Sequence, residues 1–297
     1  MSFELKHSES VGDGLERISS EQLDDTLKLL KKRNGDLIET VHEVRKDGKK
    51  VRAALHLARA GLSAQTYRYE NEFFRDIGHQ LSDARDAQIL VEAIDNLHHR
   101  NNEGNGARSF EKVRTVLLQQ RDALNALLKA KNTLQYLVES LEQARKRIGT
   151  WNLNAIGFQD LESGVCESFK RGRAVLDLAY SKPSFENFHD CRKRVKCLHY
   201  QARILHRVWP EVLDTLEEET GKLGDLLGED HDLGVLGQLL KVKPDLFGGT
   251  QSLRNLTRLI ERRRESLRKE ARPLGEKVYH EKPKVFVRRL EAVWQAW

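Results

Sequence analysis

The sequence predicts an all-α fold, built as two pseudo-symmetric four-helix bundles that arise from an internal duplication. No stretch alternates apolar and polar residues with a period of two, whereas apolar residues recur throughout at helical spacing. The 297 residues include only five prolines and 32 % charged residues, which is typical of helical proteins. One helical pattern also occurs twice, at 41–58 and at 188–205, and such self-similarity indicates duplication.

Cap residues and breaks set the expected elements of the first half. Ser20 and Asp36 are typical helix N-caps, and Glu39 completes a capping-box pattern after Asp36. In chain order we expect a weakly ordered N-terminus (1–18), a helix from Ser20 to the stop at Asn34-Gly35, a helix from Asp36 to about Gly61, a helix over about 66–100, a loop over 101–109 and a long helix from about Phe110.

The second half repeats this order, and we place the domain boundary near Gly149-Thr150, which gives domains 1–149 and 150–297. Segments 77–90 and 223–236 also match each other, with a one-residue gap relative to the first repeat. In chain order we expect a helix over about 155–180, a helix from Ser184 to about Trp209-Pro210, a helix containing 223–236, a loop over 241–250, a long arginine-rich helix up to Pro273 and a final helix over about 283–297.

The repeated helix carries a basic stripe beside its apolar stripe. At about 100° per residue, the cations of each copy fall on one arc. The acids Glu43, Asp47 and Asp190 are expected to point elsewhere, which leaves the cations without partners on their own helix. Unpaired like charges repel one another, so this pattern favours a site for an anion rather than an ordinary solvated face. The stripe residues are His42, Arg45, Lys46, Lys49, Arg52 and His56 in the first copy, and His189, Arg192, Lys193, Lys196, His199 and Arg203 in the second.

Bulk composition excludes several classes of protein. The net charge of +6 is modest, so the clustering of charge carries more information than its total. Three cysteines without motif spacing indicate a reduced, cytoplasmic protein rather than a disulfide framework. No apolar run resembles a signal peptide or a membrane span, so no membrane partner is expected.

These motifs resemble the CHAD domain, the conserved-histidine α-helical domain. The resemblance rests on VHEVRKDGKKVRAAL and FHDCRKRVKCLHYQARIL, on segments 77–90 and 223–236, and on the C-terminal LGEKVYHEKPKVFVRRLEAVW. It implies two four-helix bundles around a basic central cavity that binds inorganic polyphosphate. His199 and His231 depart from the arginines usual at those positions, which lowers the fixed charge of the second half. The matching residues are His42, Arg45, Lys49, Lys50 and Arg52, with His189, Arg192, Lys193 and Lys196.

The residue types suit a linear phosphate chain. Arginine grips phosphate oxygens bidentately, lysine acts as a point charge, and both bind by displacing counterions. His42 and His189 are expected to become cations next to a polyanion. Arg85, Asp86 and Asp232 are expected to support the site, the two acids by orienting the cations. We therefore expect a non-enzymatic polyphosphate binder in the cytoplasm, with no catalytic residue, metal or cofactor, and a role at polyphosphate granules.

Two other functions stay open at this stage. Glu229-Asp230-His231-Asp232 suggests a metal-dependent phosphohydrolase or a polyphosphate-modifying enzyme. Neighbouring residues on one helix point about 100° apart, however, and no phosphate-binding loop accompanies them. A nucleic-acid binder is the second alternative, and Tyr200 is the main aromatic residue available to stack bases.

Overall fold

The computed structural model describes residues 3–32, 36–101, 107–130 and 132–296. Within these ranges the chain is helical and has no β-strand, which confirms the all-α prediction. No helix in this part of the chain has both the length and the apolar content that crossing a membrane requires. The helices are α1 (Val11–Lys31), α2 (Leu37–Leu57), α3 (Ala64–Gln80), α4 (Ser82–Arg100), α5 (Ala107–Ala130), α6 (Thr133–Ile148), α7 (Phe158–Ser181), α8 (Phe185–Leu205), α9 (Pro210–Val242), α10 (Thr250–Val278) and α11 (Pro283–Trp294), with 3-10 turns η1 (Ala58–Gly61), η2 (His206–Val208) and η3 (Pro244–Phe247).

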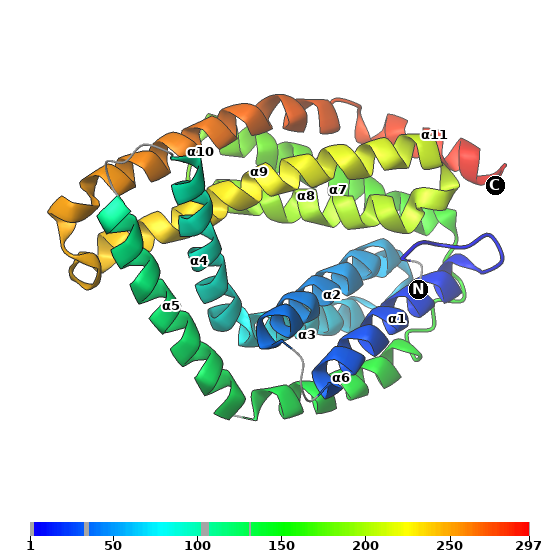
Figure 1. The fold of residues 1–297 in the computed structure, drawn as a ribbon. Coiled ribbons are helices and arrows are strands. Elements are labelled where there is room, and N and C mark those ends of the chain that lie inside the picture. The colour runs from blue at the N-terminus through cyan, green and yellow to red at the C-terminus, as the bar shows by residue number, and fades with distance from the viewer. Residues whose placement is uncertain (1–2, 33–35, 102–106, 131, 297) are drawn as a thin grey trace.

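The helices form two layers joined by a pair of struts. Helices α7 to α10 lie alongside one another in one layer, while α1, α2, α3 and α6 form the other (Figure 1). Helix α4 leads from the end of α3 across to α9 and α10, and α5 returns from there to α6 (Figure 1). Helices α2 and α8, which carry the two copies of the basic stripe, are in contact with each other.

The apolar cores do not follow the two halves of the sequence. A large core includes Val44 of α2 together with Val195 of α8. A second core joins Ile94 of α4 and Leu117 of α5 to Leu236 of α9, and also takes in residues of α10. Each core thus draws side chains from both halves, so the division between 1–149 and 150–297 stays a prediction about the sequence and is not a division of the core.

The segment between the halves is packed rather than free. Trp151, Leu153 and Ile156 are all buried. A Cβ atom at Gly12 would lie 2.1 Å from the carbonyl oxygen of Leu153, and one at Gly61 would lie 2.2 Å from the Ile156 side chain. These two positions need glycine because the linker passes directly over α1 and η1.

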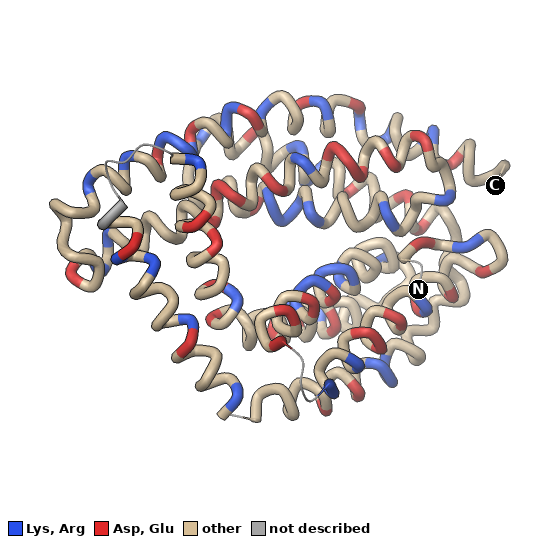
Figure 2. The backbone as a smooth tube through the Cα atoms, viewed as in Figure 1, with Lys and Arg blue, Asp and Glu red and all other residues tan. Residues whose placement is uncertain are grey.

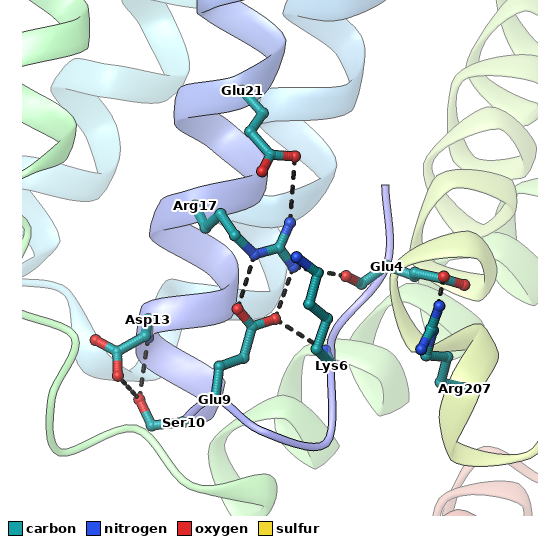
Figure 3. A network of polar contacts seen from close by, with 8 residues as sticks. All are labelled: Glu4, Lys6, Glu9, Ser10, Asp13, Arg17, Glu21 and Arg207. Atoms are coloured by element: carbon teal, nitrogen blue, oxygen red, sulfur yellow. Dashed lines mark hydrogen bonds and ion pairs between the residues drawn. The ribbon is translucent and has the colours of Figure 1, made fainter. Parts of the chain in front are cut away.

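Residues 3–18 are packed against the rest of the protein, contrary to the expectation that 1–18 is weakly ordered. Phe3 and Leu5 are buried, and α1 begins at Val11 with Ser10 as its N-cap, so Ser20 lies inside the helix. Figure 3 shows the polar network that holds this segment. Arg17 donates to Glu9 at 2.7 Å and to the Glu4 carbonyl at 2.8 Å. The Glu4 carboxylate in turn accepts from Arg207 of η2 at 2.7 Å.

Three helix boundaries differ from the predictions. The single helix expected over 66–100 is broken at Leu81 into α3 and α4, whereas its counterpart α9 is continuous. The long helix expected from Phe110 ends before Asn132, whose φ of 49° is left-handed, and α6 follows. Helix α10 continues through Pro273 to Val278 instead of ending there. The expected stop at Asn34-Gly35 and most of the loop at 101–109 lie outside the described residues.

Candidate functional site: a cation cluster between helices α2 and α8

The two helices that carry the basic stripes begin where the sequence predicts. The Asp36 side chain accepts from the Ile38 N–H at 2.9 Å, and Ser184 Oγ accepts from the Asn187 N–H at 3.1 Å. Val44 on α2 and Val195 on α8 are buried, which fixes the rotation of each helix about its axis. The basic side chains beside these apolar stripes are thereby held at the edge of the core.

Five cations from three helices come together at this edge. We call them the cation cluster: Arg45 and Lys49 of α2, Arg85 of α4, and Arg192 and Lys196 of α8. Lysine and arginine positions run along the facing sides of α2 and α8 (Figure 2). Both copies of the repeated helix thus contribute cations to one place, together with one residue from the strut α4.

The pKa of Lys49 shows how strongly the cations of this cluster repel one another. Its side chain is exposed, yet the surrounding protein removes enough water to disfavour the charged form. Burial, followed by the positive charges of Arg192, Arg45, Lys196 and Arg85, lowers the pKa of Lys49 to about 7. The charged groups with the largest effect on Lys49 are all cations, and an anion placed among them would relieve that repulsion.

The other members of the cluster have only weak or partial partners. Arg45 donates to the carbonyl oxygen of Gly78 at 2.5 Å, and its guanidinium is 3.9 Å from Asp86. Lys196 pairs with Asp225 at 3.1 Å, where that carboxylate is largely exposed. The buried Nε of Arg192 has no hydrogen-bond partner among the described residues. Donors therefore remain for an external acceptor.

A line of glycines on α9 makes room for the cations of α8. A Cβ atom at Gly224 would lie 2.8 Å from Lys196 Cε, and one at Gly228 would lie 3.4 Å from Arg192 Nε. The long side chains can therefore lie directly across the backbone of α9. Sequence reasoning aligned Gly224 with Gly78 but missed this role, although the spacing of three and four residues from Gly221 is visible in the sequence.

The histidines are neutral within this field of positive charge. His189 stacks on His231 with ring centroids 4.2 Å apart, and Phe185 stacks against both rings, 4.9 Å from His231 and 6.3 Å from His189. Burial and nearby cations lower the pKa of His189 to about 4 and that of His231 to about 3. Burial also lowers the pKa values of His42 and His199, and the His199 ring bonds to the Glu217 carbonyl at 3.1 Å. Burial first, and neighbouring cations second, thus disfavour the charged form of the two expected conditional cations, His42 and His189.

Two lysines of the basic stripes, Lys46 and Lys193, and the motif residue Lys50 are paired on their own helix, which corrects the expectation that the acids point elsewhere. Lys46 bonds to Glu43 at 2.7 Å, Lys50 to Asp47 at 2.8 Å and Lys193 to Asp190 at 2.8 Å. Each acid lies three residues before its lysine, a spacing that brings side chains together on a helix. Lys50 is also directed toward α1, where it donates to Gln22. These three lysines are therefore neutralised within their own helices.

Three further stripe residues have their own partners outside the cluster. Arg52 donates to Asn71 at 3.0 Å, and His56 bonds to the Tyr67 hydroxyl at 2.7 Å. Arg203 pairs with Glu217 at 3.3 Å and lies over the ring of Phe3.

The two acids expected to support the site, Asp86 and Asp232, lie beside the cluster. Burial raises the pKa of Asp86, and Arg45 opposes that shift. Burial likewise raises the pKa of Asp232 to about 6, opposed first by Arg192 and then by Arg85. Arg85 itself pairs with Glu92 at 3.2 Å. Asp86 and Asp232 thus offset part of the positive charge without forming close ion pairs with the arginines.

The acidic run at 229–232 does not converge on one point. Glu229 accepts from Arg263 at 2.7 Å, whereas buried Asp230 accepts from Arg264 at 3.1 Å and from Arg268 at 2.9 Å. His231 joins the aromatic stack. No group of three metal-ligating side chains is assembled in the described part of the chain. Arg263 and Arg264 therefore join α10 to α9.

Cations from two similar helices are thus gathered within an all-α frame. The chain belongs to the CHAD domain family, whose model matches residues 17–241. Among solved structures it is similar to PptA from Streptomyces chartreusis, with 13% sequence identity, a TM-score of 0.58 and coverage of 97% of this chain and 100% of that chain. A likeness at that identity shows the shared fold. A search of curated proteins finds no match.

Proposed function

We propose that this protein binds inorganic polyphosphate at the cation cluster and does not turn it over. Polyphosphate binding is the known role of the family. The observation that carries the proposal is the environment of Lys49, whose strongest charged neighbours are four cations from α2, α4 and α8. A linear chain of phosphates supplies the regularly spaced negative charge that such a surface needs.

The proposed binding mode follows from the geometry of the side chains. Arg192 and Lys196 lie one turn apart on α8, and Arg45 and Lys49 lie one turn apart on α2, so neighbours are about 5–6 Å from each other. Successive phosphates of the chain can therefore contact cations of α2 and of α8 alternately. Because these contacts replace condensed counterions, affinity should fall steeply as salt rises.

The experiment is a salt series of titrations with long-chain polyphosphate, single-stranded RNA and ATP, each with and without EDTA. We expect polyphosphate to bind most tightly, without need for a divalent metal and without release of orthophosphate. Tighter binding of RNA, or metal-dependent release of phosphate, would overturn the proposal in favour of one of the two alternatives.

The deciding variant removes four cluster cations together: Arg45→Ala, Lys49→Ala, Arg192→Ala and Lys196→Ala. With the coefficient of single-stranded nucleic acid, losing four contacts should reduce the slope of log affinity against log salt by about 2.8. Its thermal stability should match or exceed that of the wild type, because repulsion among the cations is removed. If this variant binds polyphosphate like the wild type, the cluster is not the site.

A matched control removes the same number of lysines and arginines from other surfaces: Lys28→Ala, Arg75→Ala, Lys222→Ala and Arg272→Ala. Each of these residues pairs with an acid of its own helix. The control should keep nearly all of the polyphosphate affinity. An equal loss in the two variants would indicate attraction to overall charge and would count against a defined site. Association with polyphosphate granules forms part of the same proposal, and the cluster variant should lose it in cells.

A further inference from the structure

Besides the cation cluster, a basic pocket lies beside helices α2 and α8, at a different place on their surface. This cavity of about 420 Å³ is bounded by α2, η1, α7 and α8. Its lining includes His56, Arg59, Arg171, Arg194 and Cys197. It shares no residue with the cation cluster, so the two sites can be tested separately.

The geometry of α8 separates the two sites. Arg194 follows Arg192 and precedes Lys196 by two residues, which places it about 200° from each around the helix axis. On α2, His56 lies seven residues beyond Lys49, or about 10.5 Å further along the axis. Helix α8 thus presents cations in two directions, while α2 contributes to the two sites at different levels along its axis.

Positive charge in the pocket exceeds negative charge. Arg59, Arg171 and Arg194 line it, while its one carboxylate, Glu167, accepts from Arg171 Nε at 2.5 Å. Three arginines against one glutamate leave two positive charges within the lining. Arg59 lies over the ring of Tyr67 at 5.2 Å, a contact that leaves guanidinium N–H groups available.

A neutral histidine completes the lining. The Tyr67 hydroxyl lies 2.7 Å from His56 Nδ1. Burial, followed by Arg52, Arg194, Arg171 and Arg59, lowers the pKa of His56 to about 4, so the ring is neutral at pH 7. In the tautomer that accepts a hydrogen bond from Tyr67 at Nδ1, the proton remains on Nε2 and makes His56 a donor. The pocket then offers guanidinium groups and an imidazole N–H, which are ligands for an oxyanion.

We propose that this pocket is a second anion site, which binds a terminal phosphoryl group or free pyrophosphate. Guanidinium groups match phosphate oxygens bidentately, and three of them can surround one doubly charged group. The enclosed space suits a compact anion, whereas an extended chain requires a longer surface. The phosphoryl group can come from a free small anion, from a nucleotide or from the end of a polyphosphate chain.

The test uses the full-length protein and calorimetric titration with orthophosphate, pyrophosphate and ATP. The variant Arg59→Gln/Arg194→Gln removes two lining cations, neither of which forms an ion pair among the described residues. The control Lys170→Gln/Arg173→Gln removes two exposed cations of α7 outside the pocket. Thermal unfolding of each variant verifies its fold.

We expect the wild type to bind pyrophosphate, the pocket variant to bind it at least tenfold more weakly, and the control to resemble the wild type. The four-residue cluster variant should keep this pyrophosphate affinity while it loses long-chain polyphosphate. Tighter binding of ATP than of pyrophosphate would identify a nucleotide as the source of the phosphoryl group. An unchanged pocket variant, or an equal loss in the control, would overturn the second site without bearing on the cation cluster.

Discussion

Lys49 should take up a proton when polyphosphate binds. Burial and four neighbouring cations lower its pKa to about 7 from the ordinary lysine value of 10.5, so the side chain is roughly half protonated at pH 7 in the free protein. A polyanion placed among those cations offsets their charge and restores the ordinary preference for the ammonium form. The folded protein therefore binds polyphosphate and a proton together.

The size of the effect follows from these two pKa values. If the pKa of Lys49 returns to its ordinary value in the complex, binding is linked to the uptake of about 0.5 proton at pH 7 and about 0.9 proton at pH 8. Because the pKa of Lys49 rises on binding, affinity is highest at low pH and is lost as pH increases. Between pH 7 and 8.5 the loss should be about 16-fold at most, and smaller in practice because Lys49 keeps some contact with solvent. Asp232, with a pKa of about 6, is already mostly ionised in this window.

The assay is calorimetric titration with polyphosphate in buffers of different ionisation enthalpy, which counts the protons taken up. Lys49→Met should remove most of the uptake at pH 8. Lys49→Arg should bind with little dependence on pH because a guanidinium stays charged. If Lys49→Met takes up as many protons as the wild type at pH 8, Lys49 is not the group that titrates, and its place in the site is wrong.

Two substitutions on α9 separate binding from stability. Gly224→Ala should weaken polyphosphate binding and lower the salt slope by about 0.7, because its Cβ would displace Lys196. The free energy of unfolding of this variant should stay equal or rise by up to about 1 kcal/mol, because alanine favours the helix. A large loss of stability in denaturant unfolding would show that the Lys196 side chain cannot move aside for the new Cβ atom, and would contradict this prediction. Asp230→Asn should destabilise the fold by about 3 kcal/mol, since it leaves Arg264 and Arg268 without their buried carboxylate. Polyphosphate affinity of the folded Asp230→Asn protein should be unchanged, and a loss of affinity at full folding would indicate that α10 contributes to the site.

The sequence was sufficient to predict the two helices of the site and the position of their cations. Periodicity and the caps Asp36 and Ser184 located α2 and α8 closely, because short-range geometry determines both. The same periodicity was less informative about which lysines form ion pairs with acids of their own helix. Lys46 and Lys50 can each turn toward an acid three residues earlier or away from it, and only the packing around the helix decides between the two.

Long-range packing explains the other differences. Leu81 gives no local signal for a helix break, and the turn there follows from the course of α4 toward α9. Phe3 and Leu5 precede any helical pattern, so their burial depends on surfaces supplied by residues distant in the chain. The pocket beside Arg194 likewise needs α7 and α8 together, and nothing in the spacing of α8 alone distinguishes Arg194 from an ordinary exposed cation.

The core that joins α4 and α5 to α9 and α10 has a consequence for dissecting the molecule. A chain cut between residues 149 and 150 would leave Ile94 and Leu117 uncovered on one fragment, and Leu236 on the other. Neither piece alone would be expected to remain dispersed in water, whereas two co-expressed pieces could rebuild the frame by covering each other. The two halves of the sequence thus depend on each other as parts of one folding unit.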